Sequence, residues 1–520
     1  MARLKLYPVA APATGLNKRH PASLIEDTAS PDAKNVRVEA GIMFKRLGYG
    51  TLTTGSVASG VVSGVTSLPM LAHDFPRLGG TVTAMLATCG QLYKWTGSAW
   101  VLIKSGLNGT IDGFHSATVM NDTWIYTNNV DHVQVWTGTG NASDLLGGSD
   151  YQTGNYHICR AVISFFDRLL LLGTNEDGTA YPYRVRWGEL GKTSEWKESE
   201  GGGYYDLVED PSGIQGAELL GNWVVIYCGQ SIWLGMYVGG IVVNSFNRVV
   251  PNMGCRAPRT VIDLGGEHVF MGEDDVYRFN GGSNPLGVGE AIRDELYGGV
   301  ARKHHRRCFA ALERERKLYH LYVPYGNSAG NITRAYIYDY EAGTWTIDTT
   351  PHLTCAAALQ MGGRLTIDDL PHLPIDQMNP DKTIDELGGQ EERNLMIFCD
   401  SAGHVYQDDG LHIDDAGTAV DGYWDSKDLT LDPEYVHSYK RIEEIVFEAK
   451  GDTVDVYYSI DQGANWTSAG TQTMTDTYAR YVLPIDVTTR VIRVRFRNDN
   501  SGERFWLRYF GLRYMVEADR

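Results

Sequence analysis

The stretch Tyr93-Lys94-Trp95-Thr96-Gly97 sets the pattern of this chain, because a β-rich segment there runs into a short turn built on an aromatic residue and a glycine. The pattern returns six times, as Val135-Trp136-Thr137-Gly138, Val185-Arg186-Trp187-Gly188, Ile232-Trp233-Leu234-Gly235, Tyr277-Arg278-Phe279-Asn280-Gly281, Tyr338-Asp339-Tyr340-Glu341-Ala342-Gly343 and Val405-Tyr406-Gln407-Asp408-Asp409-Gly410. By subtraction, successive glycines lie 41, 50, 47, 46, 62 and 67 residues apart. A period of roughly 40–50 residues is typical of a β-propeller. We therefore expect an all-β chain with a propeller of five to seven blades, a scaffold whose function depends on its sites.

The predicted propeller occupies residues 67–420. Blade-like units fall at about 68–110, 111–150, 155–200, 213–252, 256–290, 305–349 and 352–420. Each unit has a short apolar middle strand, such as Val82–Ala87 or Arg168–Leu172, as expected where sheets pack face to face. The last unit is interrupted by an acidic, proline-containing insert at residues 368–392, which we expect to be a loop.

The two ends of the chain do not repeat and are predicted as separate units. Residues 1–66 form an arm and a hairpin, because residues 35–49 alternate around Glu39-Ala40-Gly41. Residues 421–520 predict a C-terminal β-sandwich with strands at Ile442–Ala449, Thr453–Ile460, Tyr478–Pro484, Val491–Arg497 and Phe505–Tyr514. Arg493, Arg495 and Arg497 share one face there. A solvated sheet face is the ordinary interpretation, and pairing with an acidic neighbouring subunit is the alternative.

The charge of the chain excludes a conventional DNA-binding protein. The net charge is −18 over 520 residues, and residues 364–434 hold 18 acidic and 4 basic residues, a net of −14 that leaves about −4 for the rest. Such a surface is either a solvated, loop-rich one or a wall that repels DNA phosphates, along which DNA could slide without binding.

The cysteines and the apolar segments indicate in which cellular compartment the chain is made. Seven cysteines are scattered singly without a CxxC pair, so buried free thiols and synthesis in a reducing cytoplasm are expected. No apolar run approaches the roughly 20 residues of a membrane span, and the N-terminus lacks the features of a secretory signal.

Three short motifs resemble patterns that carry chemistry in other proteins. Ser459-Ile460-Asp461-Gln462-Gly463-Ala464-Asn465-Trp466 fits the Asp-box pattern, which shapes a hairpin turn and says little about catalysis. Gly326-Asn327-Ser328-Ala329-Gly330 matches GxSxG, but strand-like segments flank it on both sides, so a hairpin loop is predicted instead of a nucleophile elbow. The basic run Arg302–Arg307 is read as an exposed connection between blades, with a partner or phosphate contact as the alternative. The sequence identifies no catalytic, cofactor-binding or metal-binding residue.

Several stretches resemble the tail nozzle proteins of short-tailed bacteriophages, a family also called tail tubular protein B or phage stabilisation protein. The stretches are Asn35–Tyr49, with the pattern N-x-R-x-x-x-G-x-x-x-R-x-G; Phe166–Leu169 with Val185–Gly188 and Ser194–Trp196; Asn252–Thr260 with Val269–Gly281; and Ile337–Trp345. The resemblance covers about residues 35–350. This chain departs from the family where the repeat spacing widens after Gly281.

The resemblance implies a structural virion protein of the phage tail and not an enzyme. Such subunits form a homohexameric ring at the distal end of a short tail, below an adaptor ring, where they hold fibres or spikes near the host cell surface and guide double-stranded DNA during ejection. No cofactor is implied. If the acidic insert at residues 368–392 gates the channel, neutralising its carboxylates should slow DNA release.

Two other functions fit a propeller and remain open. A propeller glycosidase would need clustered carboxylates, which come from distant strands and leave no sequence motif. A glycan- or receptor-binding propeller would expose aromatic side chains on one rim and bind sugars saturably.

Overall fold

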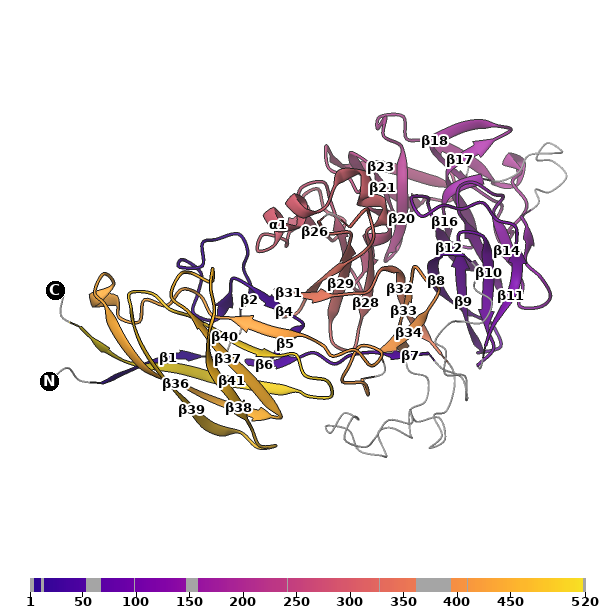
Figure 1. Ribbon diagram of the computed structural model, residues 1–520. Helices are drawn as coiled ribbons and strands as arrows, with labels where there is room; N and C mark the ends of the chain where they lie inside the picture. The colour runs from indigo at the N-terminus through magenta and orange to yellow at the C-terminus, as the bar shows by residue number, and fades with distance from the viewer. Residues whose placement is uncertain are drawn as a thin grey trace.

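The computed structural model describes residues 4–10, 14–52, 67–97, 99–145, 158–240, 242–326, 328–361, 394–408 and 410–517. Within these residues the chain is all-β, as predicted. Two assemblies of strands lie side by side in an elongated molecule (Figure 1). The acidic insert at residues 368–392 lies outside the described residues.

The larger assembly consists of seven four-stranded antiparallel sheets that follow one another along the described residues. Their strands are β8 (Pro69–Pro76), β9 (Val82–Thr88), β10 (Gln91–Trp95) and β11 (Trp100–Ser105); β12 (Ser116–Met120), β13 (Thr123–Thr127), β14 (Gln134–Trp136) and β15 (Ser143–Asp144); β16 (Ile158–Phe165), β17 (Arg168–Glu176), β18 (Thr179–Trp187) and β19 (Gly203–Asp206); β20 (Ile214–Leu220), β21 (Trp223–Cys228), β22 (Ser231–Tyr237) and β23 (Asn244–Pro251); β24 (Ile262–Asp263), β25 (His268–Met271), β26 (Val276–Phe279) and β27 (Leu286–Gly287); β28 (Phe309–Glu313), β29 (Leu318–Val323), β30 (Arg334–Asp339) and β31 (Thr344–Thr349); and β32 (Leu353–Gln360), β33 (Asn394–Asp400), β34 (Val405–Asp408) and β7 (Gly50–Thr51).

The first strands of these sheets contact one another in a closed cycle. Strand β8 contacts β12, and the contacts continue through β16, β20, β24, β28 and β32 back to β8. A hydrophobic cluster fills each space between neighbouring sheets. Ile125 packs with Leu169 between the second and third sheets, and Leu86 packs with Ile397 between the first and seventh. Face-to-face burial of apolar side chains therefore holds the sheets together around the whole cycle.

The aromatic–glycine repeat marks the third strand of every sheet. Its seven instances fall on β10, β14, β18, β22, β26, β30 and β34. Gly97, Gly138 and Gly281 have positive φ angles and so turn the chain, whereas Gly235 lies inside β22. The spacing widens after Gly281 because helix α1 (Arg293–Gly299) and the 3₁₀ turn Arg302–Arg307 lie between the fifth and sixth sheets.

The seventh sheet is completed by a strand from the N-terminal part of the chain. In β7, Gly50 pairs with Gln407 and Thr51 pairs with Tyr406 of β34. The backbone N–H of Leu52 continues this pairing to the carbonyl of Val405 at 2.9 Å. The last sheet of the cycle is therefore completed by a strand that precedes all seven sheets in sequence.

The smaller assembly contains two sheets that combine both ends of the chain. One has the order β39 (Ala479–Thr489), β36 (Lys440–Gly451), β41 (Phe505–Val516), β6 (Ile42–Lys45) and β5 (Val36–Glu39), with β1 (Lys5–Ala10) also paired to β41. The other has the order β38 (Thr467–Thr473), β37 (Thr453–Ser459), β40 (Arg493–Asn498), β35 (Gly422–Asp425) and β4 (Ala33–Lys34). The N-terminal and C-terminal units that the sequence analysis divided at residues 66 and 421 thus build these two sheets jointly.

The expected N-terminal hairpin is present as β5 and β6. Ala40 and Gly41 connect the strands with φ angles of 49° and 77°. Two successive positive φ angles match the twist of a two-residue hairpin. A short parallel pair, β2 (Gly15–Leu16) with β3 (Ala29–Ser30), and the 3₁₀ turns Glu198–Glu200, Pro258–Thr260 and Pro433–Tyr435 complete the described elements.

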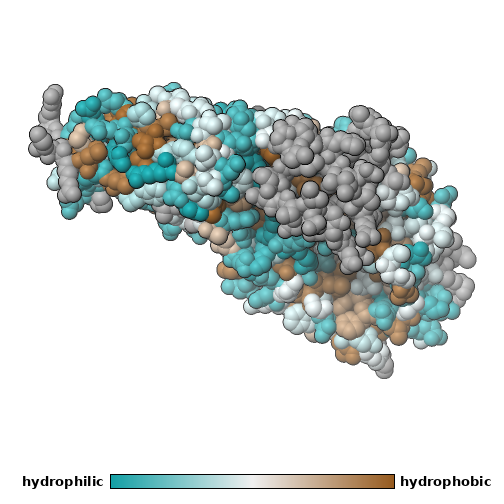
Figure 2. All heavy atoms as spheres, turned by 90° about the horizontal axis from the view of Figure 1, so that it is seen from below, coloured by the Kyte–Doolittle hydropathy of each residue, from teal (hydrophilic) through white to brown (hydrophobic). Residues whose placement is uncertain are grey.

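One hydrophobic core joins the two assemblies. Trp345 and Ile347 of β31 belong to the same buried cluster as Leu16, Val36 and Trp424. In the coloured part of the face seen from below, hydrophilic residues surround separate groups of apolar ones (Figure 2). All seven cysteines are free and six are buried, as the sequence predicted.

Candidate functional site: the central cavity

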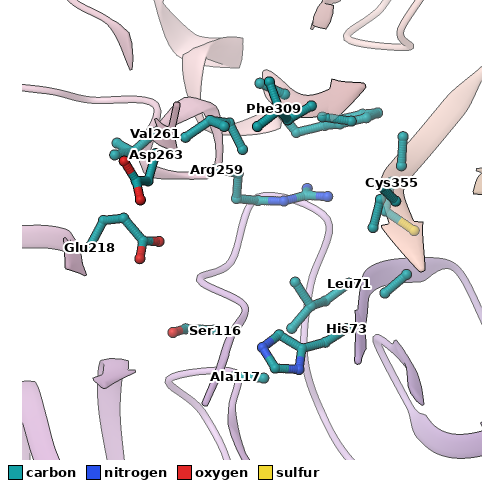
Figure 3. Close-up of a pocket in the computed structure, with 18 of the residues that line it drawn as sticks. Leu71, His73, Ser116, Ala117, Glu218, Arg259, Val261, Asp263, Phe309 and Cys355 are labelled. Carbon is teal, nitrogen blue, oxygen red and sulfur yellow. The ribbon is translucent and has the colours of Figure 1, made fainter. Parts of the chain in front are cut away.

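A cavity of about 770 Å³ lies where the seven first strands meet. Strands β8, β12, β16, β20, β24, β28 and β32 all contribute to its wall. Much of the wall is made of small or apolar side chains, including Leu71, Ala117 and Val261. Figure 3 shows the charged side chains of Arg259, Glu218 and Asp263 among them.

Arg259 reaches across this cavity from the turn that precedes β24. Its Nη2 donates hydrogen bonds to the carbonyl oxygens of Met70 and Thr354, each at 2.6 Å. Met70 belongs to the first sheet and Thr354 to the seventh, so one side chain binds both sheets at the place where the cycle closes. The guanidinium also lies over the ring of Phe309, with 5.0 Å between Cζ and the ring centroid.

The charge of Arg259 is not neutralised by a carboxylate in the described residues. Burial lowers the pKa of Arg259, and the nearby groups that act against this are the thiols of Cys355, Cys89 and Cys308 and the phenol of Tyr126. Cys89, Cys308 and Tyr126 are neutral at pH 7, since burial raises the pKa of Cys308 to about 12 and also raises the pKa of Cys89 and of Tyr126. A guanidinium stays protonated in proteins, so the cavity contains a buried positive charge.

Glu218 lines another part of the same cavity, and its pKa is higher than that of an ordinary glutamate. Burial, with a smaller contribution from the charge of Asp263, raises the pKa of Glu218 to about 7, although the hydrogen bond from the backbone N–H of Leu219 acts to lower it. That N–H donates to Glu218 Oε1 at 3.0 Å. Asp263 Oδ1 accepts from the backbone N–H groups of Gly265 and Gly266 at 2.8 and 3.2 Å. Glu218 can therefore hold a proton near neutral pH, as a general acid does.

A second pocket, of about 540 Å³, lies between the seven sheets and the two-sheet assembly. Its wall includes the ion pair of Arg37 with Asp348, in which both guanidinium nitrogens donate at 2.8 and 2.6 Å. Arg316 and His320 bind Glu313 in the same wall, which lowers the pKa of Glu313 to about 2. These carboxylates are engaged in structural ion pairs, Glu313 within its own sheet and Asp348 with an arginine distant in sequence.

The two catalytic-looking motifs have structural roles. The Asp box forms the turn between β37 and β38, where Ser459 Oγ and the backbone N–H of Asn465 donate to Asp461 Oδ1 at 2.7 and 2.9 Å. Gly326–Gly330 connects β29 to β30, two strands of one sheet, with positive φ angles at Gly326, Ala329 and Gly330. No helix follows Ser328, so the predicted hairpin loop is confirmed and a nucleophile elbow is not formed.

The three arginines of β40 are neutralised within the chain. Arg493 pairs with Asp428, Arg495 with Asp425 and Arg497 with Asp421, at 2.6 to 2.9 Å. Each of these arginines therefore has a carboxylate partner in its own chain, and pairing with an acidic neighbouring subunit stays untested. Their partners lie on and around β35, an element that the sequence analysis did not predict.

The sequence named no catalytic, cofactor-binding or metal-binding residue, and the residues that the cavity brings together were not foreseen. Arg259 gave no signal because its partners are backbone carbonyls of distant sheets. The family-like stretch Asn252–Thr260, which contains it, was the nearest indication. Within the described ranges, no three or more His, Cys, Asp or Glu side chains are placed to hold a metal ion. None of the described helices has the length and hydropathy to span a bilayer.

Comparisons with known proteins give only weak similarities. No family model matches the chain, and no curated protein matches it. Among solved structures, the computationally designed Ika8 protein aligns with 68% of this chain and 98% of its own, at 11% identity and a TM-score of 0.35. A mutant of the family 29 carbohydrate-binding module CBM29-2 aligns with 23% of this chain and 71% of its own, at 15% identity and a TM-score of 0.15. Scores this low carry no argument about fold or function.

Proposed function

We propose that the larger assembly is a seven-bladed β-propeller. Three observations support this proposal: the closed cycle of contacts among the first strands, the hydrophobic cluster between each pair of neighbouring sheets, and the aromatic–glycine repeat on the third strand of each sheet. Completion of the last sheet by β7 is the usual way in which such a ring is locked. Seven blades is the upper end of the range that the repeats predict.

On this scaffold, the chain would serve as a structural protein of a virion, the tail nozzle of a short-tailed phage. The single observation that carries the proposal is the interlocked construction of the chain. Residues 33–52 contribute β4, β5 and β6 to the two-sheet assembly and β7 to the ring, so neither part is independent of the other. A subunit that must withstand internal pressure in a tail needs such a rigid body. The resemblance to nozzle proteins includes this same stretch, Asn35–Tyr49.

DNA would pass between copies of the chain and not through the propeller. Arg259 crosses the central cavity and binds both of the sheets that close the ring, and a volume of about 770 Å³ lined by side chains is far too small for a duplex. A channel would therefore be the hole of a larger ring, expected to be six-fold, built from heterologous contacts. The net charge of −18 suits such a wall, because it repels phosphates. The partners would be the adaptor ring and the fibres or spikes of the tail.

The mass of the purified protein tests this proposal. Light scattering and negative-stain microscopy, with and without the adaptor protein of the tail, should give a ring of six copies with a central hole. Monomers in both conditions, at concentrations above those in an infected cell, would contradict it.

A second candidate, a propeller glycosidase, is favoured by one observation. Glu218, whose pKa burial raises to about 7, and Asp263 are two carboxyl groups in the wall of one cavity, the kind of pair that glycoside hydrolysis uses. The test is hydrolysis of a panel of oligosaccharides by the wild type and by Glu218→Gln. Turnover that falls at least a hundredfold in the variant would support an enzyme, and binding without turnover would support a glycan-binding propeller. Absence of both in the wild type would exclude this candidate.

A further inference from the structure

A pair of arginines lies at the edge of the central cavity, although the chain as a whole is strongly acidic. Arg160 on β16 lines the cavity, and the charge of Arg306, in the 3₁₀ turn Arg302–Arg307, acts on it. Neither arginine forms an ion pair with a carboxylate among the residues described. Arg306 does act on Asp112, but Arg307 already binds that carboxylate through two nitrogens at 2.7 and 2.9 Å.

Arg160 and Arg306 lie over the same aromatic ring. Their Cζ atoms are 5.1 and 4.8 Å from the centroid of Phe114, which lines the cavity. The pKa of Arg160 is lowered first by burial and then by the charge of Arg306. Two guanidiniums that share one ring repel each other, and the ring quadrupole offsets only part of this repulsion. An anion between them would remove it.

The two guanidiniums keep hydrogen-bond donors available. Each guanidinium has five N–H donors. Arg160 uses Nη1 for the carbonyl of Ile214 at 2.8 Å. Within the described residues, the other donors of Arg160 and those of the exposed Arg306 have no acceptor. Planar donor pairs of this kind fit the oxygens of carboxylates and phosphates better than they fit a spherical ion.

We propose that Arg160 and Arg306 form a binding site for a small oxyanion, a carboxylate or a phosphate, at the edge of the cavity. Phe114, over whose ring both guanidiniums lie, forms the apolar floor of this site. The site requires neither a ring of subunits nor catalysis, so it stands whether or not the proposed function holds. Within the basic run Arg302–Arg307, the proposal assigns anion binding to Arg306 alone.

The test is a titration of the full-length protein at constant ionic strength and pH 7.5. Sodium chloride is replaced stepwise by sodium phosphate in one series and by sodium succinate in another, and the thermal unfolding midpoint and the calorimetric heat of binding are measured. We expect a saturable rise of the midpoint with at least one of the two. A phosphate response alone identifies a phosphate site, a succinate response alone identifies a carboxylate site, and both responses identify a general oxyanion site. A non-saturable rise would be the general salting effect of these ions.

Variants separate the site from bulk electrostatics. Arg306→Gln, in an exposed residue, and Arg160→Gln should each weaken the saturable binding at least tenfold. Arg302→Gln removes the same charge from the same turn, away from Phe114, and should bind like the wild type. Equal weakening in Arg302→Gln and Arg306→Gln, or no saturable response in the wild type to either ion, would overturn the proposal. Circular dichroism shows whether each variant is folded. If Arg160→Gln does not fold, the comparison of Arg306→Gln with Arg302→Gln is enough to test the proposal.

Discussion

Arg259 illustrates how one side chain can hold a ring closed. Its two hydrogen bonds to Met70 and Thr354 join the first and seventh sheets, and hydrogen bonds from charged groups stabilise by about 1.5–3 kcal/mol. Removing the buried guanidinium also removes the cost of its desolvation, which offsets part of the lost hydrogen-bond energy. We therefore expect Arg259→Ala to destabilise the protein by about 2 kcal/mol. Chemical unfolding measures the effect, and hydrogen exchange should accelerate in β8 and β32. Arg302→Ala, which removes an exposed arginine, is the control. An unchanged unfolding midpoint would show that the two bonds add no stability.

Glu218 makes stability depend on pH in a defined direction. Its pKa is raised from the ordinary 4.5 to about 7, so the folded state binds its proton more tightly than the unfolded state does. The favourable contribution is complete below about pH 4.5 and is lost as the pH rises through about 7. Glu218→Gln should therefore be more stable than the wild type at pH 8.5, by up to about 3 kcal/mol at about 1.4 kcal/mol per pKa unit. Thermal unfolding from pH 4 to 9 measures this, and a difference independent of pH would contradict it.

At the scale of elements, β7 decides whether the seventh sheet is complete. A Cβ at Gly50 would overlap the imidazole of His412, so Gly50→Ala forces either this imidazole or strand β7 to move. Overpacking of this kind costs about 1–3 kcal/mol, and we expect the thermal midpoint to fall accordingly. Gly79→Ala is the matched control, because a Cβ at Gly79 meets nothing within 4 Å. If the two variants unfolded at the same temperature, β7 would not be closely packed against His412.

The elements that the sequence predicted are those whose signal is local. The hairpin β5–β6 has alternating apolar residues and two turn residues, and β36, β37 and β41 are long and alternate clearly. Strands β4 and β7 have two residues each, and β38 reads TSAGTQT, so none of them carries a hydrophobic pattern. Their pairing is set by distant strands, as that of Thr51 is by Tyr406. The cavity escaped prediction for the same reason, because its residues meet only when the cycle of sheets closes.

At the scale of the whole molecule, the two assemblies should unfold together. Trp345 of β31, which donates to the carbonyl of Val288 at 2.7 Å, shares a buried cluster with Phe447 and Trp424 of the two-sheet assembly. The chain also crosses between the assemblies at Lys45–Gly50 and again between β34 and β35.

We therefore expect differential scanning calorimetry to show a single transition. Phe447→Ala should lower that transition as a whole, since a buried phenylalanine contributes about 3–5 kcal/mol. Val482→Ala, in the partly exposed face of β39, changes a neighbouring strand with little loss of burial and is the control. Two resolved transitions, with only one moved by Phe447→Ala, would mean that the shared core does not couple the assemblies. Coupling of this kind is what a rigid tail subunit requires, because a force on one assembly is then carried directly by the other.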